Sequence, residues 1–165
     1  GTPLYLQVGQ TSIHCQRPDV RDLPLADVDF SPLLRAFGAR NTARLLSLML
    51  LEPRIVLLSD SLDQLFPCTV ALMELLYPFI WSYPVVPVLP PSRLSFLDSP
   101  HPYIVGVHRP CVPRGRVPST SLVADLSNNT LHVPPALSSE GLSAVEATFE
   151  SRIAACIAAL ITCSS

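Results

Sequence analysis

The chain has 165 residues, of which 48% are hydrophobic and only 15% are charged, so it is long and apolar enough to bury a substantial core. Its formal net charge of −2 argues against a nucleic-acid partner, because binding to phosphates draws on clustered Lys and Arg side chains. We therefore expect residues 1–165 to form a single domain that binds no nucleic acid.

The first elements are two short runs of strand length. Leu4–Val8 and Ser12–Cys15 flank a turn that contains glycine, and we expect them to pair as a hairpin. Residues 16–30 are polar and contain proline, which indicates a connector.

Two helices are predicted after the connector. Ser31 followed by Pro32 predicts a helix start with the serine as N-cap, and Gly38 predicts the end of this first helix. Asn41 is expected to cap the second helix. That helix is apolar almost all round as far as Leu51, so we expect it to be buried.

Three further runs are apolar throughout and about four to six residues long, which is the length of strands. Strands without polar alternation are buried on both faces, as in a mainly parallel sheet whose crossovers are helices. We therefore predict an α/β fold with helices on both faces of a mainly parallel sheet. Its strands are expected at Ile55–Leu58, Val85–Leu89 and Tyr103–Val107.

The helix between the first two of these strands carries conflicting signals. Ser61 and Gln64 predict a capping box, but Pro67 then lies well inside the helix. We therefore expect the main helix to begin near Pro67 and to end at Tyr77, because Pro78 follows.

The remaining elements are shorter. A short helix is expected at 93–97 and a mobile loop, rich in Arg and Pro, at 109–120. Leu122–Leu126 and Thr130–Val133 flank two asparagines, which tolerate the left-handed conformation of a tight turn, so we predict an antiparallel hairpin.

A last helix is predicted from a capping box formed by Ser143 and Glu146. Its longest stretch without a polar side chain, Ile153–Ile161, is too short to span a bilayer, so we predict no transmembrane segment. A wide apolar stripe follows the helix and consists of Val145, Phe149, Ile153, Cys156, Ile157, Leu160, Ile161 and Cys163.

Cysteine, histidine and glycine patterns exclude several kinds of site. The five cysteines are odd in number and form no C-x-x-C pair, which indicates a reduced intracellular protein. The four histidines are scattered, so no metal site is predicted. The six glycines are isolated, which argues against a phosphate-binding loop, and we predict no cofactor.

A small serine hydrolase is a remote alternative. The nucleophile elbow G-x-S-x-G is replaced by Leu58-Ser59-Asp60-Ser61, which lacks both glycines. Ser59, Asp125 and either His101 or His108 could converge as a catalytic triad. Caps and turns explain the serine and the aspartate equally well.

Several motifs of the chain are those of a known family. They are Leu50, Leu51 and Glu52, Arg54–Ser59, LLYPFIW at 75–81, PVLPP at 87–91 and PYIVGVH at 102–108. In this order and spacing they resemble the central segment of the DENN domain. Weaker similarity at 23–33 and 123–129 extends the resemblance over residues 23–129. Ser127 departs from it, because the family often has Asp there.

The resemblance implies part of a guanine-nucleotide exchange factor that binds a Rab-type small GTPase, promotes GDP release in membrane trafficking, and needs no catalytic side chain. A GTPase-binding scaffold without exchange activity is the alternative. The resemblance also implies a cytoplasmic protein that is recruited peripherally to membranes.

The chain is expected to be a fragment of a longer protein. The resemblance implies a module of three segments, of which this chain matches the central one. Neither the upstream longin-like segment nor the downstream helical segment is evident here. A start at Gly1 without methionine also indicates a fragment. We expect apolar faces left uncovered on the last helix, or on the helix at 41–52, to promote self-association.

Partner-binding residues are expected beyond the carboxyl ends of the strands, where functional residues of open α/β sheets gather. The candidates are Ser59 and Asp60 after the first core strand, Arg93 after the second, His108 and Arg109 after the third, and Asp125 on the hairpin.

Overall fold

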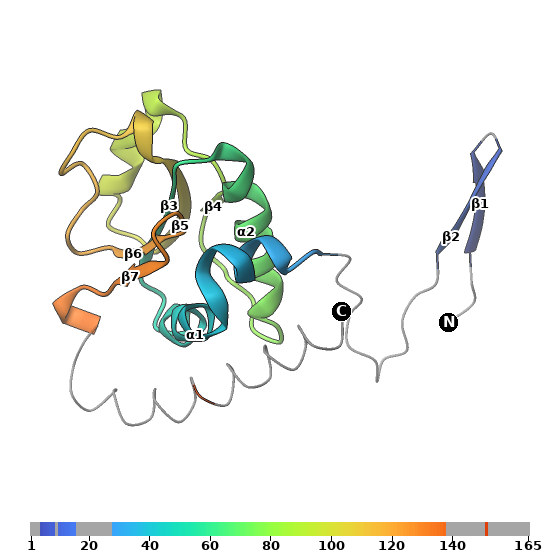
Figure 1. The fold of residues 1–165 in the computed structure, drawn as a ribbon, viewed down its shortest axis with the longest axis horizontal. Coiled ribbons are helices and arrows are strands. Elements are labelled where there is room, and N and C mark those ends of the chain that lie inside the picture. Colours follow the sequence, from blue (N-terminus) through green and yellow to red (C-terminus); the bar gives the residue numbers. More distant parts are fainter. Residues whose placement is uncertain (1–3, 9, 16–27, 138–150, 152–165) are drawn as a thin grey trace.

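The computed structural model describes residues 4–8, 10–15, 28–137 and 151. At its centre is a five-stranded sheet with the order β4-β5-β3-β6-β7 (Figure 1). β3 is parallel to both of its neighbours, β4 is parallel to β5, and β7 is antiparallel to β6. This arrangement confirms the predicted α/β class. The strands are β3 (Arg54–Ser59), β4 (Val85–Val86), β5 (Tyr103–His108), β6 (Leu122–Asp125) and β7 (Thr130–His132).

Two α-helices, α1 (Ser31–Met49) and α2 (Leu62–Leu75), cover one face of the sheet (Figure 1). Ile55 and Leu57 of β3 are fully buried on this face and belong to the same cluster as Leu72 of α2. The apolar side of α2 thus packs directly on the central strand.

The opposite face is covered by the 3₁₀ helix η1 (Pro91–Asp98) and by valines of the loop after β5. Val56 and Val105, from adjacent strands, pack there with Leu97. Tyr103 is fully buried and donates from its hydroxyl to the carbonyl oxygen of Leu97 at 2.9 Å. Both faces of the central strands are therefore apolar, which is why these runs show no polar alternation.

The start of α1 and its interior differ from the predicted caps. The predicted helix end at Gly38 is confirmed, because α1 consists of two helices that meet at this residue, whose backbone is not helical (φ 68°, ψ 162°). Ser31 is the first helical residue, and its N–H donates to Oδ1 of Asp29 at 2.8 Å. The hydrogen bonds of the Asn41 side chain are not those of a helix cap, since its amide nitrogen donates to the carbonyl oxygen and Oδ1 of Asn129 at 3.0 and 2.8 Å. A tertiary contact therefore replaces the local one.

α2 begins at Leu62 and includes Pro67, so the expectation of a helix start near Pro67 is wrong. Pro67 lacks the N–H that would donate to the carbonyl of Asp63, and the helix continues without that hydrogen bond. Ser61 is the N-cap residue, but its side chain makes no capping hydrogen bond. The predicted capping box with Gln64 is therefore also wrong.

β4 ends at Val86 rather than at Leu89 as predicted. Pro87 follows it and has no N–H with which to extend the pairing with β5. The N–H of Leu89 then donates to the carbonyl of Gly106 at 2.7 Å. The chain after β4 therefore approaches Gly106 closely.

Both predicted hairpins are present in the structure. β1 (Leu4–Val8) pairs antiparallel with β2 (Thr11–Cys15), and the turn between β6 and β7 contains Asn129 with a φ of 52°. The predicted last helix from Ser143 lies outside the described residues. Across 4–8, 10–15, 28–137 and 151, no helix has both the length and the apolar character needed to cross a membrane.

Arg116 anchors the loop at 109–120, which was expected to be mobile. Its guanidinium donates to Oδ1 and Oδ2 of Asp98 at 2.8 and 2.6 Å and to the carbonyl of Leu94 at 2.9 Å. These contacts attach the loop to η1.

Replacing Gly106 tests the contact between β5 and the chain after β4. An added Cβ would lie 1.8 Å from the carbonyl oxygen of Pro87. We expect Gly106→Ala to lower the free energy of unfolding by more than about 3 kcal/mol, because backbone atoms must move. Urea unfolding followed by circular dichroism measures this loss.

Gly115→Ala is the matched control. Its Cβ meets no atom within 4 Å, so only the strain of a positive φ is expected to act. That strain amounts to about 1 to 2 kcal/mol. A loss at Gly106 no larger than the loss at Gly115 would contradict the assigned contact.

Candidate functional site

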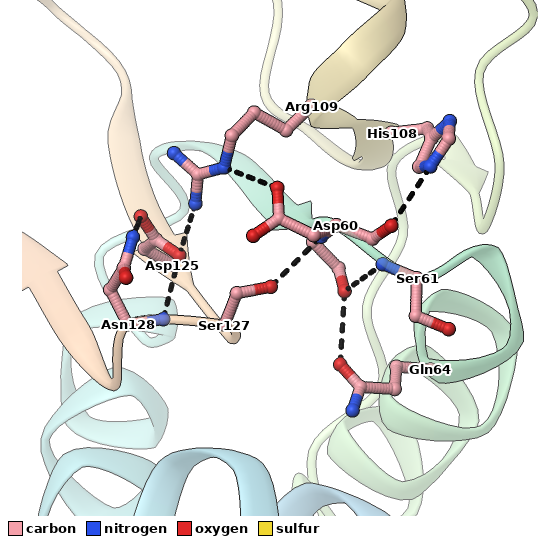
Figure 2. Close-up of polar contacts among 9 residues, drawn as sticks. Asp60, Ser61, Gln64, His108, Arg109, Asp125, Ser127 and Asn128 are labelled. Carbon is pink, nitrogen blue, oxygen red and sulfur yellow. Dashed lines mark hydrogen bonds and ion pairs between the residues drawn. The ribbon is translucent and has the colours of Figure 1, made fainter.

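Polar side chains gather where β3, β5 and β6 end (Figure 2). β3 ends at Ser59 and β5 at His108, and these two residues are paired in register. β6 ends at Asp125, which is paired with Leu58. Because the three strands are parallel, their last residues and the residues that follow them meet at one edge of the sheet, which we call the carboxyl edge.

Arg109 joins two of the three strand ends. Its Nε donates to Oδ1 of Asp60 at 2.7 Å and its Nη2 donates to Oδ1 of Asp125 at 2.5 Å. The side chain of Asp125 is only 6% exposed, whereas those of Arg109 and Asp60 are 36% and 56% exposed. The pair with Asp125 is therefore shielded from water, and the pair with Asp60 is a surface ion pair that contributes little to stability.

Asp125 has a second partner in the turn that follows β6. Asn128 donates its backbone N–H to Oδ1 of Asp125 at 3.1 Å and its side-chain amide to Oδ2 at 2.9 Å. Burial raises the pKa of Asp125, but the hydrogen bonds from Arg109 and Asn128 outweigh it, so the pKa lies below its ordinary value. The carboxylate is therefore charged at neutral pH, with a donor at each oxygen.

The imidazole of His108 links the end of β5 to the residue after β3. Its Nε2 lies 3.0 Å from the carbonyl oxygen of Asp60. A carbonyl oxygen only accepts, so Nε2 carries a proton in this contact. On the other side of the ring, Nδ1 lies 3.4 Å from Sγ of Cys111, whose thiol is a weak donor.

Further hydrogen bonds fix the backbone between β3 and α2 (Figure 2). Ser59 Oγ donates to Oε1 of Gln64 at 3.0 Å and accepts from the N–H of Ser61 at 3.1 Å. Ser127 Oγ accepts from the N–H of Asp60 at 2.8 Å. These bonds set the position of Asp60, the more exposed of the two carboxylates.

The carboxyl edge unites most of the side chains predicted for partner binding, namely Ser59, Asp60, His108, Arg109 and Asp125. Arg93 has no place in this set of contacts. It is exposed on η1, because β4 ends at Val86 and the chain runs on through residues 87–90 before η1 begins.

Three members of the network were not predicted to belong to it. Gln64 was expected to pair with Ser61, Ser127 was noted only as a departure from the family pattern, and Asn128 was expected only in the turn of the hairpin. For Asn128 a signal exists, because a polar residue three positions after an aspartate can bond back to it.

The geometry gives no support to the serine-hydrolase alternative. A triad needs a hydroxyl that donates to an imidazole, which is oriented in turn by a carboxylate. Ser59 is fully buried and donates to Gln64, and Asp125 binds Arg109 and Asn128. Within the described part of the chain, no group of three or more His, Cys, Asp or Glu residues is placed to hold a metal ion.

Comparison with known proteins gives consistent matches. The family model described as the DENN (AEX-3) domain matches residues 1–129. The chain is 34% identical over 134 residues to a DENN domain-containing protein of Schizosaccharomyces pombe, which covers 78% of this chain and 14% of that protein. It is 34% identical over 110 residues to DENN domain-containing protein 2A of Mus musculus, which covers 66% of this chain and 11% of the relative.

A third relative gives a similar result. The chain is 36% identical over 99 residues to DENN domain-containing protein 2C of Mus musculus, which covers 60% of this chain and 11% of the relative. The chain therefore spans only 11% to 14% of the length of these three relatives.

Removing Arg109 tests which of its two ion pairs stabilises the fold. We expect Arg109→Ala to lower the free energy of unfolding at pH 7 by about 2 kcal/mol, because the buried carboxylate of Asp125 loses a charged donor. Asp60→Ala breaks only the exposed pair and should cost less than about 1 kcal/mol. Equal losses in urea unfolding would show that the shielded pair is not the stronger one.

The lowered pKa of Asp125 predicts a dependence of stability on pH. The folded state binds this proton more weakly than the unfolded chain does. The stabilisation is therefore complete above the unfolded pKa of about 4 and is lost as the pH falls through the lower folded value. Asp125→Asn should lower stability at pH 7 and flatten its decline below about pH 4. If the variant and the original protein decline in parallel in urea titrations, Asp125 is not the group responsible.

Proposed function

Because this chain belongs to the DENN domain family, we propose that it forms part of a guanine-nucleotide exchange factor that binds a Rab-type small GTPase and promotes release of GDP. The proposed binding surface is the carboxyl edge. The observation that carries this assignment is the set of charged groups from three strand ends, held in place by hydrogen bonds and still open to solvent at Asp60 and Arg109.

Exchange of this kind needs no nucleophile or general acid in the exchange factor. It needs a difference in affinity: a protein that binds nucleotide-free GTPase more tightly than the nucleotide-bound form weakens nucleotide binding by the same factor. Each factor of ten corresponds to about 1.4 kcal/mol of coupling free energy. The fully hydrogen-bonded network suits this task, because a rigid surface can favour one conformation of its partner over another.

The rest of a longer protein is proposed to contribute to the same activity. An upstream longin-like segment and a downstream helical segment would hold the GTPase together with the carboxyl edge. We propose that the protein acts in the cytoplasm and is recruited peripherally to the membranes that carry its GTPase.

Charge reversal at Asp60 tests the proposed surface. We expect Asp60→Lys to slow the release of fluorescent GDP from the responsive member of a Rab panel by about tenfold, the equivalent of one lost charged contact of about 1.4 kcal/mol. The measurement uses the full-length protein and compares initial release rates at equal concentration.

Asp98→Lys is the matched control. Asp98 also pairs with an arginine and is 59% exposed, against 56% for Asp60, but it precedes β5 and lies at the opposite edge of the sheet. Its reversal should leave the release rate unchanged. If both reversals slow release equally, the carboxyl edge is not the specific surface. If the protein binds a GTPase and leaves its GDP release unaltered, it is a scaffold and not an exchange factor.

A further inference from the structure

The outer face of α2 carries apolar side chains along its length, and of these Met73 packs against the core. Leu62 and Phe66 are 47% and 61% exposed, Val70 and Met73 are half-buried, and Tyr77, in the turn after the helix, is 55% exposed. Their spacing of three to four residues places them in one row. We call these five side chains the α2 stripe.

The α2 stripe lies beside the face of α2 that builds the core, and Met73 borders both. Leu65, Cys68 and Leu72 are fully buried against the sheet and α1. Leu62 and Tyr77 are fifteen positions apart and so lie roughly 22 Å from each other along the axis at the helical rise of about 1.5 Å per residue. Contiguous exposed apolar surface of this kind commonly marks an interaction site.

The α2 stripe continues the carboxyl edge. Leu62 lies two residues after Asp60, and Gln64 of the same helix binds Ser59 of the network. An apolar area therefore borders directly on a charged one. Protein-protein interfaces commonly have this composition, with an apolar core and a polar rim.

The charges beside the stripe indicate what kind of occupant it fits. Asp63 and Glu74 are exposed on α2, and the helix contains no Lys or Arg. Together with Asp60 they give the apolar surface an acidic border. Such a border repels an anionic membrane surface and favours a protein element whose apolar side chains are flanked by Lys or Arg.

We propose that the α2 stripe is the apolar half of the surface that binds the GTPase, and that the GTPase presents to it apolar side chains bordered by basic ones. This inference rests on the proposed function and extends it from the charged network to a helix face. Phe66 is the expected anchor, because it is the most exposed member of the stripe and aromatic side chains dominate the energetics of many interfaces.

The test measures the affinity of the full-length protein for the nucleotide-free form of the GTPase that it binds in the Rab panel. We expect Phe66→Ala to weaken binding at least tenfold and Leu62→Ala with Phe66→Ala to weaken it further. Leu50→Ala is the control, because Leu50 is 41% exposed but lies just before the start of β3, at the opposite edge of the sheet. It should leave the affinity unchanged. Circular dichroism and thermal unfolding check that each variant is folded.

Three results would contradict this inference, and they differ in whether the proposed function remains supported. If the stripe variants bind as tightly as the original protein while Asp60→Lys binds weakly, the GTPase uses only the charged network and the proposed function stands. If the stripe variants change self-association in sedimentation, or binding to lipid vesicles, but not the affinity for the GTPase, the occupant is a second copy or a membrane. If the original protein binds no member of the panel, the proposed function fails together with the inference.

Discussion

The parallel pairing of β3 with β5 on one side and β6 on the other is the constraint on which the rest of the structure depends. It requires the three strands to end at the same edge, so that residues far apart in the sequence become neighbours there. It also requires both faces of β3 to be buried, which α1 and α2 achieve on one side and η1 on the other. The apolar core and the polar edge therefore have one origin.

Arg109 connects the strand ends that meet at the carboxyl edge. It meets one carboxylate that is nearly buried and another that faces solvent, so a single side chain ties the exposed edge to the interior. The turn after β6 completes the arrangement, because Asn128 binds Asp125 and Ser127 binds the backbone of Asp60. The row of apolar side chains on α2 begins beside this network, and we propose that the charged and apolar areas together form a protein-binding surface.

Much of the fold was predictable, because the strands are buried on both faces and the turns depend on local residues such as Asn129. The convergence of Ser59, His108 and Asp125 was predictable for the same reason, since parallel strands end together. Cap assignments were wrong where a tertiary partner competed with the local one, as for Asn41. Arg93 was misplaced because β4 ends at Val86, before Pro87. Which side chains bind one another depends on register, and strands that are apolar on both faces show no alternation from which the register could be read.

Hydrogen-deuterium exchange of the full-length protein, with and without the proposed GTPase in its nucleotide-free form, tests the role of the carboxyl edge most directly. We expect binding to slow exchange at the carboxyl edge and the adjoining start of α2, in residues 60–66, 109–111 and 126–129. Slowed exchange confined to the opposite edge, around Arg54, Ser99 and Thr120, which are joined there by hydrogen bonds, would contradict it.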